Sequence, residues 1–314
     1  MSYTVRVKEE ISSIKSTKSE LIAETSAYIR NNATIFKDKI TMDTENTFLV
    51  NRLQDTFKFL FNISPQVDII DNLNFNKNKL YQITISMNQK EILKTLGIYD
   101  DNGNYINTVP NYIVGGNEEI RAYLRGIFYG GGSINDPKTS RYHMEISVYK
   151  PEEAVFIQKL LNLFDLNAKI LNRDKGYMIY MKEAEKISDF LKILGANNSV
   201  MYYENIRVYR DKKNKTNRLN NMEQANMDKI IQTATSQIED IKIIEENDGL
   251  VLLDDKVKEA LEYRKKYPET SLKELAEIIS IETNKTITKS GLNHRLRKIK
   301  DLANKLKKNV SNDK

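Results

Sequence analysis

The sequence predicts an α+β fold in which a duplicated αββαββα unit is followed by an all-α helix-turn-helix domain. Helical and extended patterns recur in the same order, at an interval of about 99 residues, over the first two hundred residues. Three short helical patterns with clear start signals then follow near the C-terminus. The excess of positive charge lies in the same C-terminal part. With 314 residues, the chain is long enough for two or three domains with separate cores.

The composition excludes several kinds of chemistry. The chain has no cysteine, so it holds no disulfide, thiolate zinc site or iron–sulfur cluster, and its two histidines offer little for metal binding. We therefore expect no cofactor. No apolar run reaches the ~18 residues of a membrane span, and charges occupy the start of the chain, where a signal peptide is apolar. We expect a cytoplasmic protein without a membrane partner.

The first copy of the repeat occupies about residues 1–110. A helical pattern leads to two extended segments, a second helix, two further extended segments and a closing helix. These elements are the helix Leu21–Asn32, strands around Ile35–Thr41, the helix Phe48–Phe61, strands near Val67–Ile70 and Tyr81–Ser86, and a helix that closes at Leu96-Gly97.

The second copy, at about residues 115–210, keeps this order. Asn32 corresponds to Gly131, and the Leu-Gly pair that closes the first copy has its counterpart 98 residues later. The elements of the second copy are the helix Ile120–Tyr129, a glycine-rich turn, a strand His143–Tyr149, the helix Pro151–Phe164, strands Ala168–Leu171 and Tyr177–Met181, and a helix that closes at Leu194-Gly195.

Two such copies pair about a pseudo-twofold axis when the first helix of each packs against the other and the sheets form a saddle. Small residues let two helix backbones approach closely, and both helices have them at an i, i+4 spacing. Ala23 and Ala27 lie in the first copy, and Gly126 and Gly130 lie in the second. We therefore expect one N-terminal domain over residues 1–221.

Residues 222–250 are interpreted as a linker helix and a hinge. The apolar residues of Met222–Ile243 recur at helical intervals, which indicates packing along one side. The acidic, glycine-terminated stretch Glu245–Gly249 predicts the hinge. A basic run before the linker, Arg207–Arg218, is interpreted as a solvated loop, with a phosphate contact as the less favoured alternative.

Residues 251–308 predict three short helices. The first ends before Pro268, and the second begins with a capping box formed by Ser271 and Glu274. Either Thr288 or Ser290 caps the third helix. We expect residues 309–314 to be disordered. The expected buried stripe of the third helix is Leu292, Leu296, Ile299, Ala303 and Leu306.

The net charge of +6 lies wholly in residues 251–314, which contain 16 basic and 10 acidic residues, whereas residues 1–250 contain 33 of each. In a helix-turn-helix, the last helix enters the major groove of DNA. Asn and Arg suit bidentate contacts to adenine and guanine, and Lys suits phosphates. We expect double-stranded DNA as the partner and the nucleoid as the place of action. The residues expected to meet base edges are Ser290, Asn293, His294 and Arg297, and those expected to bind phosphates are Lys289, Arg295, Lys298 and Lys300.

Several segments resemble known families. Leu124–Gly132 resembles the nonapeptide motif of LAGLIDADG homing endonucleases, and Thr25–Ala33 resembles a decayed first copy of it. Arg121–Pro137, together with Ser271–Ala276 and Lys289–Lys298, resembles the WhiA family of bacterial regulators, and this resemblance covers essentially the whole chain. It implies a LAGLIDADG-like N-terminal domain joined to a C-terminal helix-turn-helix. It also implies a DNA-binding regulator connected to sporulation or to cell division and chromosome segregation.

The same motif argues against cleavage of DNA. In endonucleases of this fold, the eighth motif position is an acid that holds the catalytic divalent metals. Here these positions are Asn32 and Gly131, which lack the anionic oxygen that Mg²⁺ requires. Asp136 is near in sequence but follows the glycine turn. We therefore expect a non-catalytic DNA-binding protein without a metal. Two alternatives remain: an interaction scaffold of the division machinery, whose N-terminal domain binds a regulatory or division protein, and a residual endonuclease.

Overall fold

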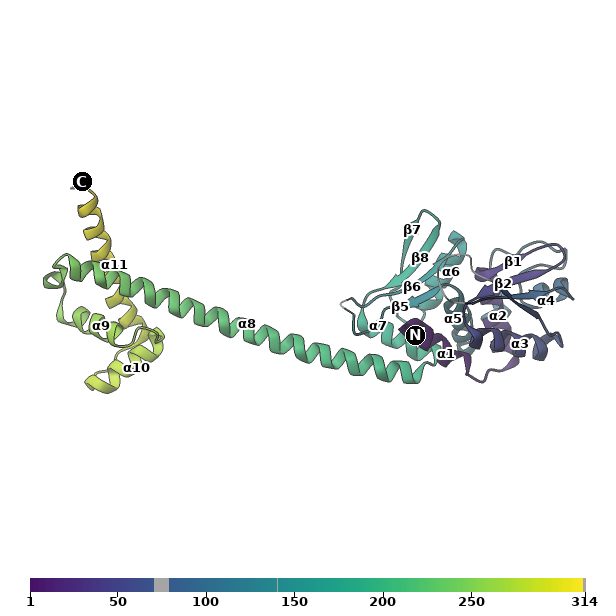
Figure 1. The fold of residues 1–314 in the computed structure, drawn as a ribbon, viewed down its shortest axis with the longest axis horizontal. Coiled ribbons are helices and arrows are strands. Elements are labelled where there is room, and N and C mark those ends of the chain that lie inside the picture. The colour runs from purple at the N-terminus through teal and green to yellow at the C-terminus, as the bar shows by residue number, and fades with distance from the viewer. Residues whose placement is uncertain (71–78, 140, 313–314) are drawn as a thin grey trace. The chain divides into compact units, whose positions relative to one another are not determined.

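The computed structural model describes residues 1–70, 79–139 and 141–312, without the side chains of residues 308–312. Contacts divide the chain into two compact units, Met1–Asp211 and Lys212–Lys314. Figure 1 shows the fold and labels most of its helices and strands. Within the described ranges, no helix is long and apolar enough to cross a membrane.

The first unit contains the duplication, preceded by a short additional helix, α1 (Tyr3–Ser12). The order of elements predicted for the first copy is confirmed, and in the second copy the structure adds the strand β5 (Gly132–Ile134) where the sequence predicts a glycine-rich turn. The first copy contains α2 (Lys18–Asn32), β1 (Ala33–Ile35), β2 (Ile40–Thr44), α3 (Thr47–Phe61), β3 (Gln66–Ile70), β4 (Leu80–Ile85) and α4 (Gln89–Thr95). After the 3-10 turn η1 (Asn111–Ile113), the second copy contains α5 (Asn117–Gly131), β5 (Gly132–Ile134), β6 (Met144–Val148), α6 (Pro151–Asn162), β7 (Lys169–Arg173), β8 (Gly176–Met181) and α7 (Ala184–Leu194).

Each copy forms a four-stranded antiparallel sheet, and the strand orders β1-β2-β4-β3 and β5-β6-β8-β7 are equivalent. The registers correspond as well. Met42 pairs with Ile83 in the first sheet, and Ile146 pairs with Ile179 in the second. All four side chains are buried on the face that α3 covers in one copy and α6 in the other. The duplication therefore extends to individual pairs of core residues.

The centre of the first unit is the contact between α2 and α5. A Cβ added to Gly126 would overlap the Glu24 carbonyl oxygen and would lie 2.8 Å from the Ala27 Cβ. Ala27 is the counterpart of Gly126 in the first copy, so each helix brings a small residue to the crossing. This confirms the expected role of small residues at the axis.

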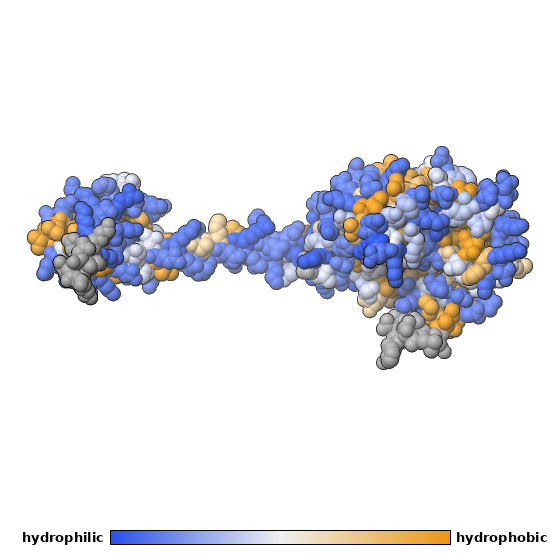
Figure 2. Space-filling view, turned by 90° about the horizontal axis from the view of Figure 1, so that it is seen from above, coloured by the Kyte–Doolittle hydropathy of each residue, from blue (hydrophilic) through white to orange (hydrophobic). Residues whose placement is uncertain are grey.

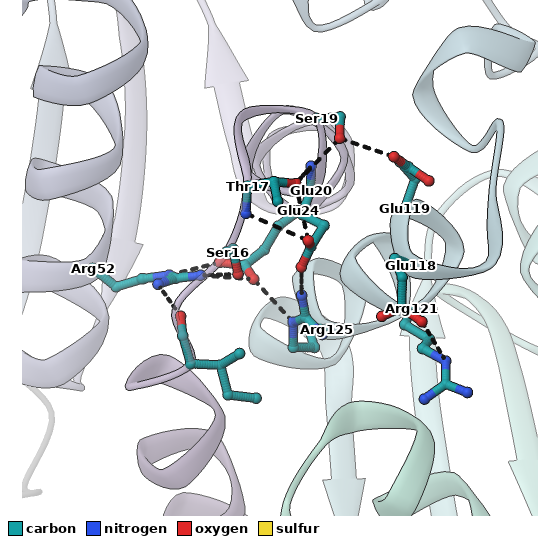
Figure 3. A network of polar contacts seen from close by, with 11 residues as sticks. Ser16, Thr17, Ser19, Glu20, Glu24, Arg52, Glu118, Glu119, Arg121 and Arg125 are labelled. Atoms are coloured by element: carbon teal, nitrogen blue, oxygen red, sulfur yellow. Dashed lines mark hydrogen bonds and ion pairs between the residues drawn. The ribbon is translucent and has the colours of Figure 1, made fainter.

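A buried ion-pair network holds the same two helices together and reaches α3 (Figure 3). Arg125 Nε on α5 lies 3.2 Å from Glu24 Oε2, and Arg52 Nε on α3 lies 2.9 Å from Glu24 Oε1. A further nitrogen of Arg125 lies 3.3 Å from Glu20. Two guanidinium groups thus compensate the charge of Glu24, which removes most of the cost of burying a lone carboxylate.

A continuous helix, α8 (Asn197–Glu246), leaves the first unit and enters the second. The interpretation of Arg207–Arg218 as a loop is wrong, because no Gly or Pro interrupts residues 197–246 and Asn and Lys only modestly disfavour a helix. The surface along the middle of α8 is mainly hydrophilic (Figure 2). Met227 and Ile231 are exposed there, and burial begins only at Ala234. Within Met222–Ile243, the predicted packing along one side therefore holds only from Ala234 onward.

The second unit has its own core, to which the end of α8 contributes Ile241 and Ile244. The predicted capping box of Ser271 and Glu274 is confirmed. The Thr288 hydroxyl accepts from the Gly291 N–H, so Thr288 rather than Ser290 caps the last helix. That helix continues to Asn312, although the sequence predicts disorder from residue 309, and residues 313–314 lie outside the described part. The elements are η2 (Gly249–Leu252), α9 (Asp255–Lys266), α10 (Leu272–Thr283) and α11 (Lys289–Asn312).

Candidate nucleic-acid interface

One side of α11 packs into the core of the second unit, and the opposite side is exposed to solvent. The predicted stripe is confirmed: Leu292, Leu296, Ile299 and Ala303 are buried, and Leu306 packs against them. Residues three and four positions apart share a face of a helix. Between Ser290 and Lys300, five exposed side chains of α11 make no hydrogen bond or ion pair with another described residue. We call them the α11 face: Ser290, Asn293, His294, Arg297 and Lys300.

Two of the basic residues predicted to bind phosphates are engaged inside the domain. Arg295 donates to Glu259 at 2.9 Å, and its side chain is only 19% exposed. Lys298 lies 3.1 Å from Asp254, and this hydrogen bond holds the pKa of Asp254 below its ordinary value. Both contacts tie α11 to α9. Lys289, at the start of α11, is exposed and has no such partner among the described residues, so it is more available to a phosphate than Arg295.

The two degenerate motif positions end the axis helices, Asn32 on α2 and Gly131 on α5. Asn32 Oδ1 lies 2.8 Å from the position of a Cβ built on Gly130, so the two helix ends are in contact. A Cβ on Gly131 would overlap the Ser147 carbonyl oxygen on β6 and would lie 2.9 Å from Asn31 Nδ2. The second position is therefore closed sterically, in addition to being uncharged.

A cavity of about 440 Å³ lies beside these helix ends. Arg173 and Lys175 line it, together with Asn31 and Asn32, and no carboxylate does. Asp136 accepts instead from the Lys138 N–H and from the Tyr202 hydroxyl. Within the described residues, no group of three or more His, Asp or Glu side chains is arranged to hold a metal ion. The donors at this site favour an anion over a divalent cation.

The outer faces of the two sheets differ in charge, although their strands correspond. Side chains alternate along a strand, so the outer face can be assigned from the register. In the first sheet, Asp43 pairs with Gln82, which pairs with Asp68. In the second sheet, Glu145 pairs with Tyr180, which pairs with Lys169, and Arg173 lies at the end of the same strand. Lys169 and Arg173 do not stand out in the net charge of residues 1–250, which is zero, whereas a count by strand face finds them.

The fold and the α11 face define a helix-turn-helix protein that carries a second, duplicated α+β domain. Models of known families match almost the entire chain. The WhiA N-terminal LAGLIDADG-like domain matches residues 18–99, the WhiA LAGLIDADG-like domain matches residues 120–213, and the WhiA C-terminal HTH domain matches residues 216–303. The chain belongs to the WhiA family.

Individual relatives agree with this assignment. The "Probable cell division protein WhiA" of Enterococcus faecalis is 40% identical and covers 98% of this chain and 99% of its own length. The protein of the same name from Lysinibacillus sphaericus is 39% identical over 98% of each chain. The crystal structure of full-length DUF199/WhiA from Thermatoga maritima covers 97% of this chain and 99% of its own, with a TM-score of 0.59 and 24% identity. That structure supports the fold.

Proposed function

We propose that this chain is a sequence-specific DNA-binding protein without nuclease activity, and a transcriptional regulator linked to sporulation or to cell division and chromosome segregation. The main support for this proposal is the α11 face. It presents an Asn, a His and an Arg on the first turns of a helix whose other side is buried. The names of the relatives support a role in cell division. Such a protein acts at the nucleoid.

Recognition follows from the position of each side chain on α11. Arg297 suits a bidentate contact to guanine and Asn293 a bidentate contact to adenine. Lys289 and Lys300 neutralise phosphates on either side and position the helix without reading sequence. Arg295 and Lys298 serve first to hold α11 against α9, through Glu259 and Asp254.

Binding of the full chain to DNA sites selected from a random pool tests this proposal. Arg297→Ala should weaken binding to the selected site by about 1–3 kcal/mol and relax the preference at one base pair. Lys305→Ala is the matched control, because Lys305 is exposed on α11 but lies beyond the first turns. An unchanged affinity and footprint for Arg297→Ala would remove the assigned role of the α11 face.

The absence of nuclease activity is proposed because neither helix end carries an acid and because the Gly131 position is closed by β6. Incubation of the protein with supercoiled plasmid and Mg²⁺ tests it. We expect no nicking above that of the buffer alone. Nicking that depends on Mg²⁺ would contradict the proposal and would favour the residual endonuclease.

One observation favours the alternative of an interaction scaffold. The outer face of the first sheet carries Asp43 and Asp68 and, on the paired positions given above, no base, so it repels phosphates and suits a basic protein surface. Expression of a chain that lacks residues 251–314 in cells without the intact protein separates the two functions. Restored division would favour the scaffold, whereas loss of function would favour DNA binding.

A further inference from the structure

The second unit contains a cavity of about 250 Å³ that is separate in chemistry from the α11 face. Four basic residues line it, each from a different helix, and no carboxylate is among the lining residues. Three residues with hydroxyl side chains, Thr233, Thr270 and Ser271, also line it. The basic residues are Lys229 on α8, Arg264 on α9, Lys273 on α10 and Lys289 on α11.

Arg264 is the unusual member of this set because it is 1% exposed and forms no ion pair with an acid in the described part of the chain. Its Nη1 donates to the carbonyl oxygens of Thr270 at 2.7 Å and Tyr267 at 3.3 Å. Its Nε is buried and has no hydrogen-bond partner among the described residues. Burial alone lowers the pKa of Arg264, and no carboxylate opposes that effect. A buried charge that is neither paired nor fully hydrogen-bonded is costly, so an anion bound beside this guanidinium would offset that cost.

The first turn of α10 adds backbone donors to the same cavity. The first N–H groups of a helix have no partner within it, and the helix dipole makes this end positive. The Ser271 hydroxyl accepts from the Glu274 N–H, and the Glu274 carboxylate accepts from the Ser271 N–H. The N–H groups of Leu272 and Lys273 remain without a described partner. The one acid at this helix end is thus engaged in the cap.

The three lysines can still move toward a ligand. Lys229 and Lys289 are exposed and form no ion pair within the described part of the chain. Lys273 Nζ lies 4.0 Å from Glu277, at the limit of an ion pair, and its side chain is 77% exposed. Mobile cations around a fixed, buried guanidinium are an arrangement that suits an anion with several oxygens.

We propose that this cavity binds a phosphate group, with Arg264 and the first turn of α10 as its fixed part and Lys229, Lys273 and Lys289 as its mobile part. The cavity is larger than one phosphate group, so it can also hold part of the molecule that carries the phosphate. Two sources share this chemistry: a backbone phosphate of duplex DNA and a free phosphorylated small molecule. The inference does not depend on the proposed DNA-binding function, because the second source requires no DNA.

Titration of the full chain with inorganic phosphate, against sodium chloride at the same ionic strength, tests the site. The Nε–H resonance of Arg264, assigned by its loss in Arg264→Lys, should shift with phosphate and not with chloride. In calorimetry, the double variant Lys229→Ala/Lys273→Ala should bind phosphate about fivefold more weakly, since exposed cations each contribute modestly. Lys242→Ala is the matched control, because Lys242 is exposed on α8 and does not line the cavity.

Equal responses to phosphate and chloride, or an unchanged phosphate affinity in the double variant, would overturn the proposal.

Repeating the titration with the selected DNA site bound separates the two sources. If the source is the DNA backbone, bound DNA abolishes the phosphate-dependent shift of the Arg264 Nε–H resonance. In that case the double variant also binds all duplexes more weakly, and the slope of log affinity against log salt concentration falls in magnitude by about one. If the source is a free molecule, the shift is the same with and without DNA. A chain that binds no DNA but still binds phosphate would contradict the proposed function alone.

Discussion

The two copies of the αββαββα unit share their inner faces and differ on their outer faces. Ile83 and Ile179 occupy the same place in equivalent registers, and both are fully buried. On the outer faces, Gln82 lies between two aspartates in one copy, whereas Tyr180 lies between a glutamate and a lysine in the other. Close packing penalises changes in a core, whereas surface changes away from special features cost little. Packing therefore preserves the fold of both copies, while the exposed side chains of each copy can differ.

The axis helices show the same divergence at their crossing. Arg125 has Ser26 as its counterpart 99 residues earlier, so the buried network around Glu24 belongs to one side of the pseudo-twofold axis. Ser26 donates instead to the Leu96 carbonyl oxygen at 2.7 Å. Equivalent places in the two helices therefore stabilise the unit by different means.

We expect the largest difference in stability between variants of the two copies at Arg125 and its counterpart Ser26. Arg125→Ala should lower the free energy of unfolding of the first unit by about 3–5 kcal/mol, because it removes one of the two guanidinium groups that compensate the buried Glu24 and an ion-pair partner of Glu20. Ser26→Ala, at the counterpart position, should lower it by about 1 kcal/mol through the loss of one hydrogen bond. Urea denaturation of the full chain, followed by circular dichroism, measures both. Equal losses would contradict the asymmetry of the axis.

Truncation of a core side chain on the inner face of either sheet should lower the free energy of unfolding by a similar amount. Ile83→Ala and Ile179→Ala should each lower the free energy of unfolding by about 2–5 kcal/mol, because each opens a cavity in the same core. Ile69→Ala is a suitable control, because Ile69 lies on a strand of the first sheet but is 56% exposed. The same urea experiment would show whether the two core variants shift one common transition. A large loss for one and none for the other would mean that the copies do not share a core.

Replacement by aspartate should affect the stability of the first unit differently at the two degenerate motif positions, Asn32 and Gly131. Gly131→Asp should lower the free energy of unfolding of the first unit by about 1–3 kcal/mol, because its Cβ overlaps the Ser147 carbonyl oxygen. Asn32→Asp changes charge without adding volume and should cost less. Thermal unfolding with and without Mg²⁺ measures both effects. If the double variant were stabilised by Mg²⁺, the steric argument at Gly131 would be wrong.

The smallest expected effect concerns the outer faces. Lys169→Ala/Arg173→Ala should weaken binding of the full chain to nonspecific duplex by less than about 1 kcal/mol, and only at low salt, because both bases are exposed. Asp43→Asn/Asp68→Asn on the first sheet should not weaken it. Fluorescence anisotropy at several salt concentrations distinguishes the two faces. An equal loss for both pairs would show that the charge difference has no bearing on DNA.

Much of this architecture could be predicted from local patterns. The capping box at Ser271 and the buried stripe of α11 depend on residues close together in the sequence, so local spacing predicts them. The duplication is visible because the same order of local patterns occurs twice. The helical state of Arg207–Arg218 was missed because a polar composition suggests a loop, whereas the absence of Gly and Pro lets α8 continue.

The remaining site features depend on contacts between distant elements. The pairing of Arg295 with Glu259 and the burial of Arg264 arise only when α9, α10 and α11 pack together. Arg264 in particular sits in a basic run, Arg264–Lys266, in which the sequence alone does not distinguish the buried member from its exposed neighbours.

The glycine at the end of α5 also bears on how this family can change over time. A single codon change to aspartate at residue 131 would introduce a side chain where the β6 backbone already lies. An acid at the end of each axis helix would therefore require a shift of that strand together with two replacements, and the replacement at residue 131 alone would be destabilising. The backbone of β6 therefore limits which side chains residue 131 can carry, independently of the charge of that side chain.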